Sequence, residues 1–248
     1  MAVMKLKLTS QDEFRRLLTA LLDDLVDARF HFSLHQDLSK VSEEYATEFA
    51  QTPTFWGFTL SAHIDAVMVR LCMSYDTYGD SVLNLRNLLE TVQANLSIFD
   101  KPNFRQRLKG NAFVDSLAAE LKPPDDAQLR KDIQEVTVSD PLVHKLVQWR
   151  HNYIAHRNRD CALNPQKLST EHPLLFVEID ELLERALKIG NRYSLLFDAS
   201  VHATTMIGKD DYLHVLRSVR EHAKAQKRAL DEEWKRLRVA ARPPKAMT

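Results

Sequence analysis

Glycine and cysteine are scarce in this chain of 248 residues, which contains five glycines and two cysteines. Glycine-rich phosphate loops and tight β-hairpins depend on glycine, so a protein built on them is nearly excluded. Two cysteines, Cys72 and Cys161, are too few for a four-cysteine zinc site or a disulfide framework. The chain also lacks the apolar run of a signal peptide or a membrane span. The sequence therefore predicts a soluble, cytoplasmic protein without a membrane partner.

An excess charge of either sign is absent as well, because 34 Lys and Arg residues balance 34 Asp and Glu residues. A neutral chain is unsuited to binding nucleic acid over its whole surface, although a local basic patch remains possible. Residues 209–248 hold eleven basic and six acidic residues. Three interpretations of this tail are open: a solvent-facing charged helix, an RNA-binding helix and a partner-facing helix.

Helical periodicity dominates the chain and predicts an all-α fold with a long first helix and a long charged C-terminal helix. A capping box at Ser10–Glu13 begins the first helix, and Asp140-Pro141 begins a later one. We expect short helices and loops between residues 100 and 138. Asp80 or Ser81 is the expected cap of the third helix. The helices that we expect span, by residue number, 10–52, 58–79, 82–96, 141–158, 180–193 and 210–241, and the first of them is either straight or kinked. We expect residues 1–208 to form a helical domain and residues 209–248 a basic C-terminal helix and tail.

The most distinctive segment is Trp149–Arg159, which contains three arginines and no acidic residue before Asp160. On a helical wheel, Arg150 falls in the middle of the apolar arc of its helix. A guanidinium in that position needs a carboxylate, a carbonyl or a phosphate as its partner. Asp65 and Asp76 are the two candidate carboxylates for a structural ion pair, and a substrate phosphate is the functional alternative. We expect Tyr153 to belong to the core.

The same segment resembles the R-x(4–6)-H signature of the HEPN superfamily (higher eukaryotes and prokaryotes nucleotide-binding), with five residues between Arg150 and His156. Two further stretches are similar to its abortive-infection U-like branch. One is Val69–Asp76 followed by the leucine-rich 83–89, and the other is Asp140-Pro141-Leu142 leading into the signature. The resemblance covers roughly residues 10–200.

This resemblance implies a HEPN-like helical bundle that forms a homodimer and acts as a metal-independent endoribonuclease of a phage-defence or toxin–antitoxin system. Such an enzyme leaves 2′,3′-cyclic phosphate ends on RNA. Arg150 would clamp the scissile phosphate and His156 would act as the acid or base. The residues expected to bind RNA or to orient the catalytic pair are His151, Asn152, Arg157 and Arg159. No metal and no cofactor are expected, since His31 and His35 have metal-ligand spacing but no third ligand nearby.

Two other interpretations stay open. The first is a non-catalytic HEPN dimer that binds RNA or a protein partner, such as a cognate antitoxin or a nucleotidyltransferase protein. The second is a purely structural helical dimer in which Arg150 forms a buried salt bridge. The tests that separate them are cleavage of RNA without metal and binding of RNA without cleavage.

Overall fold

The computed structural model describes residues 6–76, 79, 81–155, 158–164 and 166–240. These residues form helices, turns and loops with no strand among them, which confirms the predicted all-α fold class. In chain order the helices are α1 (Gln11–Val41), α2 (Ala46–Gln51), α3 (Pro53–Ser74), α4 (Leu85–Ala94), the 3₁₀-helix η1 (Leu96–Phe99), α5 (Lys101–Arg107), α6 (Val114–Glu120), α7 (Asp126–Glu135), α8 (Pro141–Trp149), the π-helix η2 (Arg150–Ile154), α9 (Arg159–Leu163), α10 (Lys167–Glu171), α11 (Phe176–Asp198) and α12 (Tyr212–Ala240).

The chain divides into two compact units. The first comprises residues 1–33 and 62–205, and the second comprises residues 34–61 and 206–248. The predicted boundary at residue 208 stays a prediction. No helix in the described part of the chain is both long enough and apolar enough to cross a membrane.

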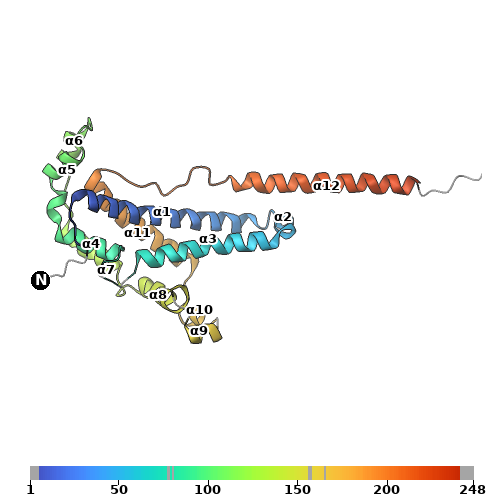
Figure 1. The fold of residues 1–248 in the computed structure, drawn as a ribbon, viewed down its shortest axis with the longest axis horizontal. Helices are drawn as coiled ribbons and strands as arrows, with labels where there is room; N and C mark the ends of the chain where they lie inside the picture. Colours follow the sequence, from blue (N-terminus) through green and yellow to red (C-terminus); the bar gives the residue numbers. More distant parts are fainter. Residues whose placement is uncertain (1–5, 77–78, 80, 156–157, 165, 241–248) are drawn as a thin grey trace, which may run out of the picture. The chain divides into compact units, whose positions relative to one another are not determined.

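The first unit is built around α1, the second half of α3 and α11, which lie side by side in Figure 1. Phe197 of α11 is fully buried, and its ring lies 4.8 Å from that of Phe14 and 5.6 Å from that of Phe99. Gly190 lets α11 approach α1 closely, because a Cβ atom at this position would fall 2.5 Å from Leu22 Cδ2. Tight packing at this contact fixes the helices that support the signature segment.

The second unit has a small core of its own, formed by Leu38, Tyr45, Trp56 and Leu216. Arg220 of α12 lies over the Tyr45 ring, with Cζ 4.0 Å from the ring centre, and donates to Glu48 Oε1 at 2.7 Å. These contacts attach the beginning of α12 to α2.

Most helix boundaries differ from the sequence prediction by a few residues, as in α3, which spans Pro53–Ser74 instead of 58–79, and two differences have a local cause. The expected helix 10–52 is interrupted after Val41, where the Ser42 hydroxyl donates to the Ser39 carbonyl at 2.7 Å and so competes with helical hydrogen bonding. Asn84, rather than Ser81, caps α4, since its side chain accepts from the Asn87 amide at 2.8 Å. The other expected cap, Asp80, lies outside the described residues.

Candidate functional site

The helix that leads into the signature begins where the sequence predicts. The Asp140 carboxylate accepts from the amides of Leu142 and Val143 at 2.9 and 3.1 Å, and Pro141 occupies the first turn. Asp140 also forms an ion pair with Arg185 of α11 at 2.9 Å. These contacts set the start and the direction of α8.

The signature itself is not a continuous α-helix. From Arg150 to Ile154 the backbone forms a π-helical turn, in which the Ala155 amide donates to the Arg150 carbonyl at 2.9 Å. The expected helix to residue 158 is therefore wrong in its last part. A π-turn holds one residue more than an α-turn, so it changes the direction in which the following side chains point. Single π-turns occur mostly inside α-helices and often at functional sites.

Arg150 is held by Asp76, just beyond the end of α3. Its Nη2 atom donates to Asp76 Oδ2 at 2.7 Å, and the two side chains are 22% and 11% exposed. Of the two carboxylates considered from sequence, Asp76 is thus the ion-pair partner and Asp65 is not. Breaking such a largely buried pair is costly, so the pair fixes the position of the guanidinium.

Cys72, one turn before Asp76 on α3, belongs to the same surroundings. It is almost fully buried, and burial raises the pKa of its thiol to about 12; the positive charge of Arg150 acts in the opposite direction. The thiol is therefore protonated at neutral pH and is a poor nucleophile. Cys72 serves as packing beneath the ion pair.

Asn152 holds the end of the π-turn. Its amide nitrogen donates to the Gln148 carbonyl at 2.8 Å, and its side-chain oxygen accepts from the Asn158 side chain. Asn158 in turn caps α9, because its side-chain oxygen accepts from the Cys161 amide at 2.7 Å. Asn152 and Asn158 thus tie together the two ends of the segment that carries residues 156 and 157.

The remaining predicted residues have different outcomes. His151 is half-buried on the π-turn, and Arg159 is exposed at the first position of α9. His156 and Arg157 lie outside the described residues. The structure brings Arg150 together with Asp76 and joins Asn152 to Asn158. Sequence reasoning missed Asn158, although an asparagine before a helical turn is a common cap signal.

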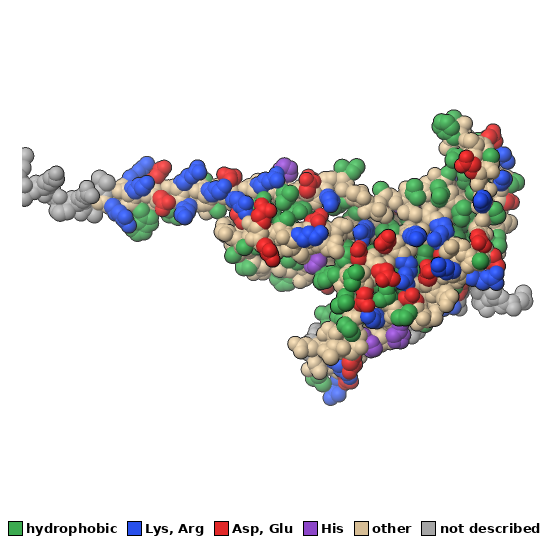
Figure 2. All heavy atoms as spheres, turned by 180° about the vertical axis from the view of Figure 1, so that it is seen from behind, with side chains coloured by type: hydrophobic (Ala, Val, Ile, Leu, Met, Phe, Trp, Pro, Cys, Tyr) green, Lys and Arg blue, Asp and Glu red, His purple; other side chains and the backbone are tan. Residues whose placement is uncertain are grey.

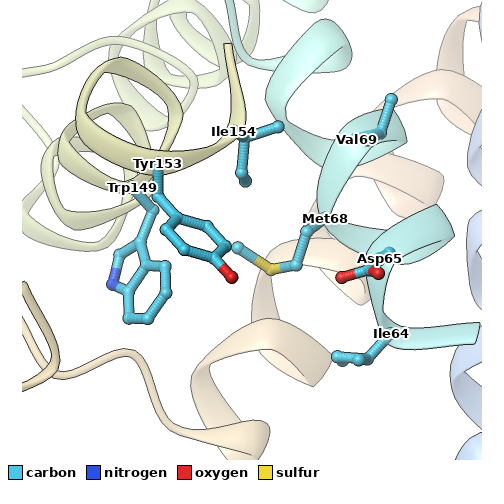
Figure 3. Close-up of a pocket in the computed structure, with 7 residues that line it drawn as sticks. All are labelled: Ile64, Asp65, Met68, Val69, Trp149, Tyr153 and Ile154. Atoms are coloured by element: carbon cyan, nitrogen blue, oxygen red, sulfur yellow. The ribbon is translucent and has the colours of Figure 1, made fainter. Parts of the chain in front are cut away.

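A pocket of about 470 Å³ opens between α3 and the signature. Trp149 and Tyr153 project into it toward Met68 of α3, and Asp65 lies on the same wall as Met68 (Figure 3). Tyr153 is 49% exposed, so its predicted place in the core is wrong. Tyr153 lies within the π-turn, which directs its ring into the pocket. The Trp149 indole is fixed by a hydrogen bond from Nε1 to the His172 carbonyl at 2.8 Å.

A second, smaller hollow of about 150 Å³ adjoins this pocket and shares Ile64, Met68 and Trp149 with it. Its other walls are Leu174, Phe176 and Ile179. Three large apolar side chains that line the two hollows are exposed, namely Val69, Tyr153 and Phe176, and Met73 and Leu175 are exposed nearby in the sequence. Several exposed apolar side chains at a hollow are typical of an interaction site.

The histidines singled out for metal spacing do not form a metal site in the described residues. His31 Nδ1 lies 2.8 Å from His63 Nδ1 of α3, whereas His35 Nδ1 contacts the Leu60 carbonyl at 3.1 Å. No cluster of three or more His, Cys, Asp or Glu side chains suited to a metal ion occurs within the described part of the chain.

The family model HEPN_AbiU2, described as AbiU2, matches residues 11–218. The chain belongs to this family. It is a HEPN protein of the abortive-infection branch, and its fold is the HEPN-like helical bundle predicted from sequence. No curated protein and no solved structure gives a significant match. The family match ends inside α12, so most of that helix lies beyond it.

Proposed function

We propose that this HEPN protein is a metal-independent endoribonuclease that acts in phage defence, alone or as the toxin of a toxin–antitoxin pair. The observation that carries the proposal is the Arg150 guanidinium, fixed by Asp76 on a π-turn and 22% exposed at its side chain. An arginine that only stabilises a core has no need of a distorted helix or of access to solvent. Both features favour an arginine that meets a ligand.

The chemistry requires one cation and one proton-transfer group. His156 removes the proton from a ribose 2′-hydroxyl, or returns a proton to the leaving group, and Arg150 stabilises the charge on the phosphate. The 2′-oxygen bonds to phosphorus while the bond from phosphorus to the 5′-oxygen breaks. The products are a 2′,3′-cyclic phosphate end and a 5′-hydroxyl end, and no metal-bound water takes part.

Asp76 is a positioning residue in this proposal. A guanidinium has five N–H donors in a fixed plane. A carboxylate that binds one edge of this plane therefore fixes the direction in which the other edge points. Asn152 and Asn158 anchor the segment that carries His156 and Arg157. Arg159 adds a positive charge for the RNA backbone next to this segment.

The exposed apolar surface around the signature supports a homodimer. Val69, Met73, Tyr153, Leu175 and Phe176 are large side chains that a second copy would cover. In such a dimer the two signature segments approach each other across a two-fold axis. His156 of one copy then serves Arg150 of the other, which gives a composite site.

The decisive experiment is RNA cleavage by the full-length protein in excess EDTA. We expect fragments that end in 2′,3′-cyclic phosphate and a dimer by light scattering at micromolar concentration. His156→Ala should lower the rate about 100-fold or more with an unchanged unfolding midpoint. His144→Ala, an exposed histidine on the neighbouring α8, is the matched control and should cut at the wild-type rate.

Arg150 needs a more careful substitution, because Arg150→Ala removes the ion pair with the largely buried Asp76 and destabilises the fold. Arg150→Lys keeps the charge but loses the planar fork, so it should fold and cut slowly. Wild-type-rate cleavage by Arg150→Lys, or by His156→Ala, contradicts these roles. A monomeric active enzyme contradicts the composite site alone.

The Arg150–Asp76 ion pair also favours a second candidate function, a non-catalytic HEPN dimer that binds RNA or a protein such as an antitoxin or a nucleotidyltransferase. In that case the pair is structural and no cleavage occurs under any ionic condition. If the protein binds RNA with an affinity that falls steeply with salt, but does not cleave it, then the binding function is correct and the nuclease function is not.

A further inference from the structure

The long helix α12 is covered at its beginning and uncovered over the rest of its length. Leu216 is fully buried in the core of the second unit, and Arg220 is bonded to Glu48. From Lys224 to Arg238 every side chain is exposed. Figure 2 shows this part of the helix with Lys and Arg side chains along it and acidic side chains among them. The outer part of α12 therefore lacks the packing that normally stabilises a helix.

Apolar side chains continue along this uncovered part on the same face as Leu216. Ala223, Leu230 and Leu237 follow it at intervals of seven residues, and Trp234 lies between the last two. Leu230, Trp234 and Leu237 are 56%, 62% and 55% exposed. This spacing is the a and d pattern of a coiled coil, with the leucines and Ala223 at d and Trp234 at a. The seam that begins as packing inside the second unit thus continues without a partner in the described residues.

We propose that the partner is α12 of a second copy, aligned antiparallel to form a two-stranded coiled coil. In a parallel dimer Lys227, at an a position, would face the same lysine of the other copy. In an antiparallel dimer a positions pack against d positions, so Lys227 lies beside the partner's Leu230. The same alignment places Ala223 opposite the partner's Trp234, a small residue against a large one.

Charges on the flank of the seam select the register. At the e positions, this alignment sets Lys224 opposite the partner's Asp231, and the two-fold symmetry repeats the pair. Sliding one helix by one heptad in one direction places Lys224 beside the partner's Lys224. Sliding it by one heptad in the other direction places Asp231 beside the partner's Asp231. Pairs of opposite charges across a coiled coil determine which partner and which orientation are favoured. The coiled coil ends at about Ala223 of one copy and Trp234 of the other, because Arg220 is already bonded to Glu48 and because Arg217 would meet the partner's Arg238.

Disulfide linking in the full-length chain tests both orientation and register. We expect Lys224→Cys/Asp231→Cys to form a covalent dimer on mild oxidation, joined from position 224 to position 231. Seven helical residues span about 10.5 Å, beyond the roughly 7 Å reach of a disulfide, so this link must join two copies. Glu221→Cys/Arg228→Cys has the same spacing on the far face and is the matched control that should not link.

Charge exchange is the second test. Lys224→Asp and Asp231→Lys should each weaken association about 10-fold by sedimentation at low salt, and the combined variant should restore it. Arg228→Asp/Glu232→Lys changes the same charges on the far face and should have no effect. A combined variant as weak as the single ones, a 224-to-224 link, or no link would overturn the proposal. Unchanged association, with RNA retention lost in Lys224→Asp and kept in Asp231→Lys, would assign α12 to nucleic acid instead.

Discussion

The two long helices α11 and α12 carry similar apolar stripes, yet their surroundings differ greatly. Ten residues of α11 are buried, from Ile179 to Phe197. On α12, Leu216 is the one fully buried apolar side chain among those described. An apolar stripe therefore predicts that a face will be covered, but it does not say whether the same chain supplies the cover. For α11 the cover comes from other helices of the first unit, α1 among them, and for α12 we propose a second copy.

The largest expected effect comes from truncating one aromatic side chain on each helix. Phe197→Ala removes a ring that packs on Phe14 and Phe99 and lies 3.9 Å from the Arg107 guanidinium carbon, so it should cost about 3–5 kcal/mol of unfolding free energy. Trp234→Ala should change the unfolding free energy of dilute protein by less than about 0.5 kcal/mol. Urea denaturation followed by circular dichroism measures both. A large loss in Trp234→Ala would show that α12 is part of the main core.

A smaller effect is expected where backbone approach, rather than side-chain volume, limits the packing of α11. Gly190→Ala gains about 1 kcal/mol of helix propensity but drives a methyl group into the buried Leu22, which costs about 1–3 kcal/mol. The sum should be a destabilisation of up to about 2 kcal/mol. Gly57→Ala, inside α3 with no atom within 4 Å of the new methyl group, is the control and should stabilise by about 0.5–1 kcal/mol. Equal shifts of the two thermal midpoints would contradict the close contact.

The smallest effect concerns His31 and its neighbour His63 in the first unit. Burial, and next the charge of Arg70, lowers the pKa of His31 below its usual 6.5, whereas Asp27 acts in the opposite direction. The unfolded chain then binds this proton more readily than the folded one. Stability should fall as pH drops through about 6.5 and level off below the folded pKa. The wild type should lose more stability than His31→Gln between pH 7.5 and 5; equal losses by urea denaturation would sink the assignment.

Much of the fold was predictable because capping and periodicity are local. Asp140-Pro141 starts α8 as expected, and the long first and last helices are present. The break after Val41 was missed, because the sequence pattern does not distinguish a serine whose hydroxyl bonds to a nearby carbonyl from any other polar residue. The cap of α4 was misplaced for a similar reason, because three polar residues before that helix compete for one role.

The cation of the candidate site, Arg150, could be predicted from the sequence, but the geometry around it could be predicted less well. The place of Arg150 on the apolar arc indicated that it needs a partner such as a carboxylate. Only the distances in the structure show that this carboxylate is Asp76 and not Asp65. The outward position of Tyr153 could not follow from a wheel drawn at 100° per residue, because the π-turn departs from that angle. The pocket beside Tyr153 is lined by residues of α3 and of the signature, which lie about 80 residues apart in the sequence. A contact between such distant segments leaves no local pattern in the sequence.

The π-turn at Arg150–Ile154 also bears on how such a signature tolerates insertions and deletions. One extra residue in an α-helix normally rotates everything after it by about 100°. A π-turn absorbs that residue within a single turn of backbone, so α8 on one side and Asn158, the cap of α9, on the other can stay where they are. A signature with four to six residues between its arginine and its histidine can then keep one architecture at several lengths. In this chain, deletion of a single residue from the turn should leave a folded signature with shorter spacing, rather than a broken helix.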